Sequence, residues 1–238
     1  MFWGLLGDSL SAQDAFDAAI QAYRTALAVL MEGDGGAGCD ECRRARASLH
    51  AAIASAHVGA GAHDEGIRAY EEALRLDPSP ANFVCLGEIH EMQGRPKRAR
   101  SLYRGALRRD PEHVGALNHL AGTYLWTDPK RVRRLAELAL RKQPNDAEAL
   151  TNRAQAYRAF GRVDEALSDL DRALEIDPNL IAARFNRGAI RYAKRDYRGS
   201  LADFDRCVEL DPHLPAPYFN RAAVHDALGD RQAGIADL

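Results

Sequence analysis

Apolar residues recur three and four positions apart along most of the chain. The run from 163 to 176 is one example, because its apolar side chains fall on a single stripe while charged residues occupy the positions between them. This spacing places one apolar face on each predicted helix. The apolar positions of that run are Val163, Ala166, Leu167, Leu170, Ala173, Leu174 and Ile176. The pattern predicts a succession of short amphipathic helices and no strands.

Prolines and glycines divide these helices at a regular interval. Five prolines are spaced by 33, 33, 34 and 34 residues, at Pro78, Pro111, Pro144, Pro178 and Pro212. A proline cannot continue a helix, and the glycines between runs (Gly94, Gly161 and Gly229) permit tight turns. The predicted unit is therefore a helix, a short turn, a second helix and a proline.

The period and its residues resemble the tetratricopeptide repeat family. Residues 147–180 match it at Leu150, Ala154, Tyr157, Ala166, Leu170, Ala173 and Pro178. The resemblance implies an all-α, right-handed superhelix (a solenoid) of tandem helical hairpins. It also implies a non-enzymatic interaction scaffold, whose first helices line a concave groove.

We expect one array over residues 1–238. The predicted repeats are 1–31, 47–79, 80–113, 114–146, 147–180, 181–214 and a partial 215–238. The first is read from Trp3, Leu6 and Gly7 together with Ala19, Tyr23 and Ala26. Residues 32–46 depart from the pattern, and we expect a Gly-rich loop there followed by a backward extension of the next helix. Repeat 114–146 lacks one residue between its helices, where Asp128 and Pro129 can begin the second helix.

Composition indicates the cellular compartment and argues against catalysis and metal binding. The 238 residues carry a net charge of -2, and no apolar run approaches the roughly 20 residues of a membrane helix. With only four cysteines we expect a cytoplasmic protein without a disulfide framework. Cys39 and Cys42 have the one metal-like spacing, but no second pair completes four ligands. We interpret them as ordinary cysteines, with a metal site or a reversible disulfide as alternatives, and we expect no catalytic residues, no cofactor and no metal.

Positive charge is concentrated between Arg95 and Lys142, where 13 Lys and Arg face four Asp and Glu. Eight of these basic residues should lie on the outer face of second helices: Lys97, Arg98, Arg104, Arg108, Lys130, Arg131, Arg134 and Arg141. Such a basic face is typical of a surface that meets phosphate or an acidic protein. The alternative is a solvated face whose long stems cover apolar surface.

The groove positions that the family resemblance implies include three asparagines 34 residues apart, Asn152, Asn186 and Asn220. An amide both donates and accepts, so a stack of amides can pair with the backbone of an extended peptide. This arrangement is similar to the asparagine ladder in the repeat domain of O-GlcNAc transferase. Shared descent of three similar repeats explains it equally well. The full set of predicted groove residues is Asn118, His119, Asn152, Gln155, Arg158, Phe185, Asn186, Tyr192, Phe219 and Asn220.

The function predicted from these features is binding of an extended peptide or partner segment in the groove. The alternative is an architectural subunit, docked into a larger complex or onto a second copy through the basic face at 95–142 and the open array ends. RNA binding is a third reading, weakened because no aromatic residues interleave the basic cluster. We expect no membrane partner.

Two further expectations concern the hairpins themselves. Arg153 and Asp169 replace an apolar pair of earlier repeats, as do Arg187 with Asp203 and Arg221 with Asp237. We therefore predict that each Arg pairs with its Asp across one hairpin, the rival placement being arginines that point into the groove. At the end of the chain, Ile235 and Leu238 should lack full cover, and we expect another chain, a second copy or further sequence to cover that edge.

Overall fold

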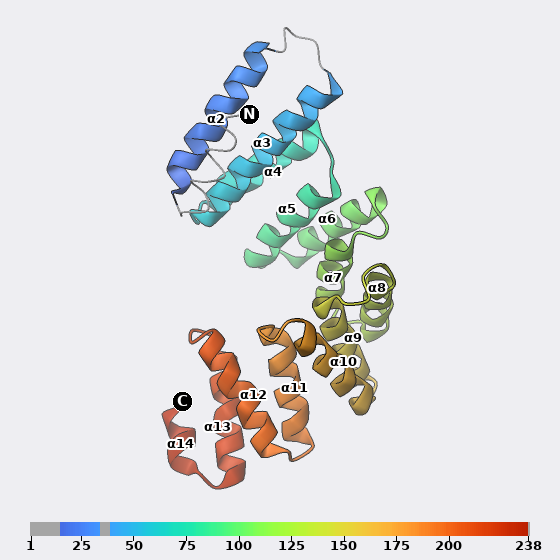
Figure 1. Cartoon of the computed structure of the whole chain (residues 1–238), viewed down its shortest axis with the longest axis vertical. Helices are drawn as coiled ribbons and strands as arrows, with labels where there is room; N and C mark the ends of the chain where they lie inside the picture. Colours follow the sequence, from blue (N-terminus) through green and yellow to red (C-terminus); the bar gives the residue numbers. More distant parts are fainter. Residues whose placement is uncertain (1–14, 34–38, 238) are drawn as a thin grey trace. The chain divides into compact units, whose positions relative to one another are not determined.

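A computed structural model of the chain describes residues 15–33 and 39–237, and all regular elements in these ranges are α-helices. The predicted all-α fold of tandem hairpins is confirmed. Figure 1 shows successive helices joined by short turns. The helices are α2 (Phe16–Gly33), α3 (Asp40–Gly59), α4 (His63–Leu76), α5 (Pro80–Met92), α6 (Pro96–Arg109), α7 (Val114–Gly122), α8 (Pro129–Lys142), α9 (Ala147–Ala159), α10 (Val163–Ile176), α11 (Ile181–Ala193), α12 (Tyr197–Leu210), α13 (Pro215–Leu228) and α14 (Arg231–Ala236).

The chain divides into two compact units, residues 1–119 and 120–238. The first contains α2 to α6 and most of α7, and the second contains α8 to α14. Consecutive helices pack against one another from α2 to α6 in the first unit and from α8 to α14 in the second (Figure 1).

Small residues allow the two helices of each hairpin to approach closely. Ala166 and Ala173 on α10 are fully buried, as are Leu150 of α9 and Leu170 of α10. In the first unit a Cβ atom added at Gly87 would lie 2.4 Å from a ring carbon of Tyr103, so only glycine fits there. These are the small and aromatic positions of the repeat pattern, and they form the core of each hairpin.

Most of the turns between paired helices contain a residue with positive φ. Glycine occupies this position at Gly61, Gly94, Gly161 and Gly229, with φ between 66° and 83°. In the α11–α12 turn the same position is Arg195, at φ 62°. A side chain in this left-handed region meets its own backbone, so Arg195 is strained where the other turns are not.

Side chains cap the starts of α3 and α8. The helix after the Gly-rich segment starts early, at Asp40, and the Cys39 Sγ accepts a hydrogen bond from the Cys42 backbone N–H at 3.0 Å. Asp128 caps α8 in the same way, accepting from the Arg131 N–H at 3.0 Å. Helix α7 ends early, at Gly122, and residues 123–127 form turns that lead to Asp128. The predicted Trp3, Leu6 and Gly7 lie outside the described residues.

Candidate functional site

A groove of about 590 Å³ lies within residues 120–238. Its walls come from the first helix of three successive hairpins, α9, α11 and α13, together with the turn before α8. The lining residues are Trp126, Gln155, Arg158, Ile181, Ala182, Phe185, Asn186, Ala189, Leu214, Ala216, Pro217 and Asn220. Among the described residues, no residue of a second helix contributes to it.

The amphipathic pattern of the first helices explains this placement. On α11, Ala183, Gly188 and Ile190 are buried against neighbouring helices, whereas Ala182 and Asn186 lie on the surface that lines the groove. A first helix therefore uses its small and aliphatic residues for packing and leaves a second set of side chains for the groove.

The lining is mainly apolar, with few polar groups. Gln155, Asn186 and Asn220 supply amides, and Arg158 supplies the one formal charge. An apolar concave surface with a small number of oriented polar groups is the usual form of a binding site.

Five of the ten predicted groove residues line this groove: Gln155, Arg158, Phe185, Asn186 and Asn220. The amides of Asn186 and Asn220 each donate a hydrogen bond to the carbonyl oxygen four residues earlier in their own helix, at 2.8 Å. Because an amide has two N–H groups and two lone pairs, each keeps an N–H and its oxygen for a ligand. Asn152, the third asparagine of the predicted ladder, does not line the groove.

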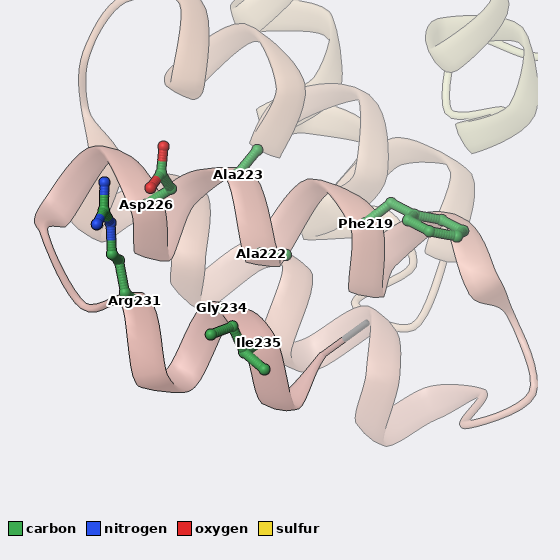
Figure 2. Close-up of a pocket in the computed structure, with 7 residues that line it drawn as sticks. All are labelled: Phe219, Ala222, Ala223, Asp226, Arg231, Gly234 and Ile235. Carbon is green, nitrogen blue, oxygen red and sulfur yellow. The ribbon is translucent and has the colours of Figure 1, made fainter.

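Two predicted aromatic residues lie elsewhere. The ring of Tyr192 packs against Tyr197, with centroids 5.7 Å apart. Phe219 lines a separate hollow of about 450 Å³ between α13 and α14, and Figure 2 shows it on α13, with Ile235 on α14. Ile235 is 74% exposed, as predicted, and Leu238 lies outside the described residues.

The remaining predicted groove residues, Asn118 and His119, belong to the first unit. Asn118 is only 4% exposed, so its burial opposes direct contact with a ligand. His119 stacks on Tyr103 with centroids 5.3 Å apart, and its Nε2 lies 2.8 Å from a Glu88 carboxylate oxygen. The Tyr103 hydroxyl donates to Glu91 at 2.7 Å. The surroundings of His119 are thus acidic, unlike the groove of the second unit.

Sequence reasoning missed Trp126, which lines the groove and is 85% exposed. It lies in the turns that follow the short α7, at the place where the repeat lacks one residue. A tryptophan in an irregular turn was the available signal, because an exposed indole buries its large apolar surface only when a partner covers it.

The three predicted Arg–Asp pairs are confirmed, and the rival placement of the arginines in the groove is not observed. Arg153 donates to both carboxylate oxygens of Asp169 at 2.7 and 2.6 Å. Arg187 does the same to Asp203 at 2.9 and 2.6 Å, and Arg221 makes the matching bidentate pair with Asp237. Hydrogen bonding to these carboxylates raises the pKa of all three arginines against the opposing effect of burial.

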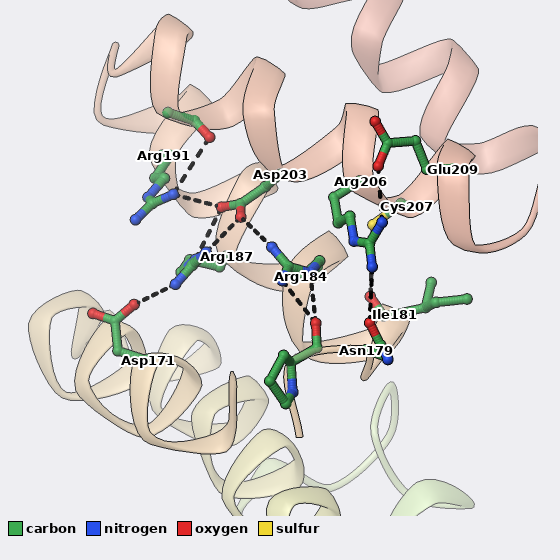
Figure 3. A network of polar contacts seen from close by, with 12 residues as sticks. Asp171, Asn179, Ile181, Arg184, Arg187, Arg191, Asp203, Arg206, Cys207 and Glu209 are labelled. Atoms are coloured by element: carbon green, nitrogen blue, oxygen red, sulfur yellow. Dashed lines mark hydrogen bonds and ion pairs between the residues drawn. The ribbon is translucent and has the colours of Figure 1, made fainter. Parts of the chain in front are cut away.

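Figure 3 shows that Asp203 is the centre of a larger network. This carboxylate is 1% exposed and also accepts a hydrogen bond from Arg191 at 2.8 Å. Arg184 lies 3.8 Å away and donates mainly to the Pro178 carbonyl. A buried charge requires such pairing, because an unpaired carboxylate in the interior is costly.

The sequence did not predict that two arginines also bind the preceding hairpin. Arg187 donates to Asp171 of α10 at 2.7 Å, and Arg221 donates to Asp205 of α12 at 2.9 Å. Each of these arginines therefore joins the helices of its own hairpin and links that hairpin to the previous one.

All eight residues of the predicted basic face are exposed. Four lie on α6 of the first unit (Lys97, Arg98, Arg104 and Arg108), and four lie on α8 of the second (Lys130, Arg131, Arg134 and Arg141). Helix α6 contains no acidic residue. On α8, Arg131 is partly engaged, since it lies over the Tyr124 ring and 3.5 Å from Asp128.

Within the described ranges, no cluster of three or more His, Cys, Asp or Glu side chains is arranged to hold a metal. In the described part of the chain, Cys39, Cys42, Cys85 and Cys207 form no disulfide. Burial raises the pKa of the Cys207 thiol to about 11, which disfavours the reactive thiolate.

Comparison with known families agrees with the geometry. Residues 147–180 match a family described as tetratricopeptide repeat, and a second family with the same description matches 51–114 and 86–125. These matches assign tetratricopeptide repeats to residues 51–125 and 147–180. TPR proteins generally serve as interaction scaffolds, and their fold is typically non-catalytic. None of the curated proteins compared with the chain matches it in sequence.

Solved TPR structures share the fold at low sequence identity. A tetratricopeptide repeat protein from Parabacteroides merdae is 21% identical, with a TM-score of 0.59 over 80% of this chain and 77% of its own. PilF of Pseudomonas aeruginosa is 16% identical, with a TM-score of 0.66 over 83% and 90%. A chain of the APC/C hetero-tetramer Cut9–Hcn1 is 16% identical, with a TM-score of 0.73 over 93% of this chain and 42% of its own.

In the part of the chain that the structure describes, no helix combines the length and apolar character needed to cross a membrane.

Proposed function

We propose that this chain is a non-enzymatic scaffold that binds an extended segment of a partner protein in the groove of residues 120–238. The observation that carries the proposal is the groove itself, an apolar concave surface lined by α9, α11 and α13. An extended peptide offers backbone N–H and C=O groups to the free amide atoms of Asn186 and Asn220, and its apolar side chains can pack on Phe185.

Affinity must come mainly from the apolar contacts. Each net hydrogen bond contributes only about 0.5–1.5 kcal/mol, so two amides alone give weak binding. Burial of apolar surface contributes about 25 cal/mol per Å², and Phe185 together with the aliphatic lining supplies that surface. We therefore propose that the whole groove, and not its asparagines alone, binds the partner segment.

The proposal is tested by quantitative pull-down with the purified chain. We compare the parent with a groove variant that combines Phe185→Ala, Asn186→Ala and Asn220→Ala, and with Gln21→Ala, an amide change at an exposed position of α2. The groove variant should capture specific partners at least about tenfold less well, because truncation of a central aromatic residue commonly costs 1–2 kcal/mol or more. Equal capture by the parent and a groove variant of unchanged helicity would remove the groove from consideration.

The second candidate function is that of a complex subunit docked through basic helix faces. It is favoured by α6, which presents Lys97, Arg98, Arg104 and Arg108 to solvent without any acid on the same helix. Binding through exposed charges weakens steeply as the salt concentration rises. Added ions shorten the distance over which charges attract, which is already only about 8–10 Å at physiological ionic strength. A partner held by this face should dissociate near 0.5 M NaCl and should not bind a variant that combines Lys97→Glu with Arg104→Glu. A partner bound in the groove should remain bound under both conditions.

A further inference from the structure

The groove is chemically uneven from one helix to the next. Where α11 and α13 form it, the lining is dominated by aliphatic and aromatic residues, Ile181, Phe185, Leu214 and Pro217. Helix α9 and the turn before α8 contribute Gln155, Arg158 and Trp126. Among the described residues that line the groove none is acidic, so no lining carboxylate neutralises the cation of Arg158.

Arg158 is exposed, and within the described part of the chain it makes no ion pair or side-chain hydrogen bond. Its neighbours along α9 differ in this respect, because Arg153 binds Asp169, and Arg162 beyond the helix pairs with Glu165 at 2.9 Å. Of these three arginines, Arg158 alone lines the groove. A carboxylate placed there gains a charge-assisted hydrogen bond without displacing an existing partner.

Trp126 adds a second specific feature to the same side of the groove. With 85% of its surface exposed, the indole can bury more apolar area on binding than any other lining residue. Tryptophan and arginine are also the residue types most enriched where truncation costs the most binding energy.

We propose that the groove selects an acidic–apolar segment: a partner strand with a large apolar side chain that packs on Trp126 and Phe185 and an Asp or Glu that pairs with Arg158. This specificity rests on the proposed groove function and names the class of ligand. A nucleic-acid strand fits the site less well, because successive phosphates require several cations and the lining offers one.

The test begins with a bead library of random decapeptides and the intact chain. Sequences enriched over beads without protein should combine one or more large apolar residues with an Asp or Glu. The dissociation constant of one enriched peptide is then measured by fluorescence anisotropy, alongside versions in which its acid is Ser or Lys. The Ser version should bind about threefold to fivefold more weakly, the range expected of a partly exposed ion pair, and the Lys version more weakly still.

Three variants locate the effect. Arg158→Glu should weaken binding of the acidic peptide by about tenfold and should prefer the Lys version. The control Arg198→Glu makes the same charge change at an exposed position of α12 outside the groove and should retain the parent preference. Trp126→Ala should weaken the binding of every enriched peptide by about tenfold or more. Both groove side chains are exposed, so circular dichroism should show unchanged helicity.

The outcomes separate this inference from the proposed function. Enriched apolar peptides that lack acids, or a preference that Arg158→Glu does not invert, overturn the acidic–apolar specificity while leaving groove binding intact. A library from which the intact chain enriches no peptide overturns both.

Discussion

Arg153 and Asp169 form the simplest of the three ion pairs, because within the described residues each makes side-chain hydrogen bonds only with the other. The Asp169 side chain is 9% exposed and that of Arg153 is 23% exposed, so solvent screens the pair only partly. In the preceding repeat the equivalent positions are Leu120 and Leu135, both buried. The fold therefore accepts either an ion pair or two leucines at this place.

This equivalence predicts a double-mutant result. Arg153→Leu alone should lower the free energy of unfolding by about 2–4 kcal/mol, because it leaves a buried carboxylate without its partner. Arg153→Leu with Asp169→Leu should recover most of that loss, since it recreates the leucine pair. Urea unfolding followed by circular dichroism measures both, and a double variant as unstable as the single one would contradict the prediction.

Changing both Arg187 and Asp203 to leucine should recover less of the stability that the single Arg187→Leu change loses. There the double change also removes an acceptor from Arg191 and the donor of Asp171. The sequence predicted the intra-hairpin pairs, because both members change together at fixed positions of one repeat. It did not predict the links to Asp171 and Asp205, because a single repeat does not specify which side chains of its neighbour come within reach.

At the scale of the element, the turns were the most predictable feature. Proline spacing and glycines set the helix boundaries, so hairpins were placed closely from sequence. The early end of α7 was not predicted, because the loss of one residue does not reveal which turn absorbs it, and with it Trp126 was missed. Phe185 lines the groove, whereas Phe219 lines a separate hollow that depends on the packing of α14.

The positive φ of Arg195 predicts a stabilising substitution. Arg195→Gly should raise the free energy of unfolding by about 1 kcal/mol, because glycine adopts the left-handed region without the steric cost that other residues incur. Gly161→Ala is the matched change in the opposite direction, and nothing lies within 4 Å of the added methyl group. It should destabilise by a similar amount through the backbone alone. Urea unfolding of the two variants beside the parent decides this, and a neutral Arg195→Gly would show that the turn is unstrained.

Helix α5 carries a pH dependence of defined sign. Burial lowers the pKa of His90 from its ordinary value of 6.5, with Arg98 and Arg95 acting in the same direction and Glu71 opposing them. Below about pH 6.5 the unfolded chain therefore binds more protons at this residue than the folded chain, and stability falls as the pH falls. Burial lowers the pKa of His50 and His57 as well, so they act with the same sign.

Hydrogen exchange of α5 and α6 amides should accordingly quicken between pH 7 and pH 5 after correction for the intrinsic rate. His90→Tyr, which places at this position the residue found at Tyr124 and Tyr157 one and two repeats later, should reduce that change. His213→Tyr is the matched substitution at an exposed position and should not. An unaltered pH response in His90→Tyr would assign the effect to other groups.

For the whole molecule, groove binding predicts that protection is confined to one unit. A peptide present at ten times its dissociation constant stabilises the bound state by about 1.4 kcal/mol. Because the lining belongs to residues 120–238, amides of α9, α11 and α13 should exchange about tenfold more slowly, and those of α3 to α6 should not change. Mass-spectrometric hydrogen exchange with and without an enriched peptide provides the measurement. Protection centred on α6 would instead support the basic face.

The arginines that reach back to the preceding hairpin limit how such a chain can evolve by duplication. Arg187 and Arg221 each require an acid on the second helix of the hairpin before, and Asp171 and Asp205 provide it. Two repeats before Asp171 the same position is Arg104. A gene rearrangement that set α11 and α12 directly after α6 would place one arginine against another, although every helix could still form. The repeats are alike in shape, yet their order along the chain is part of what the sequence encodes.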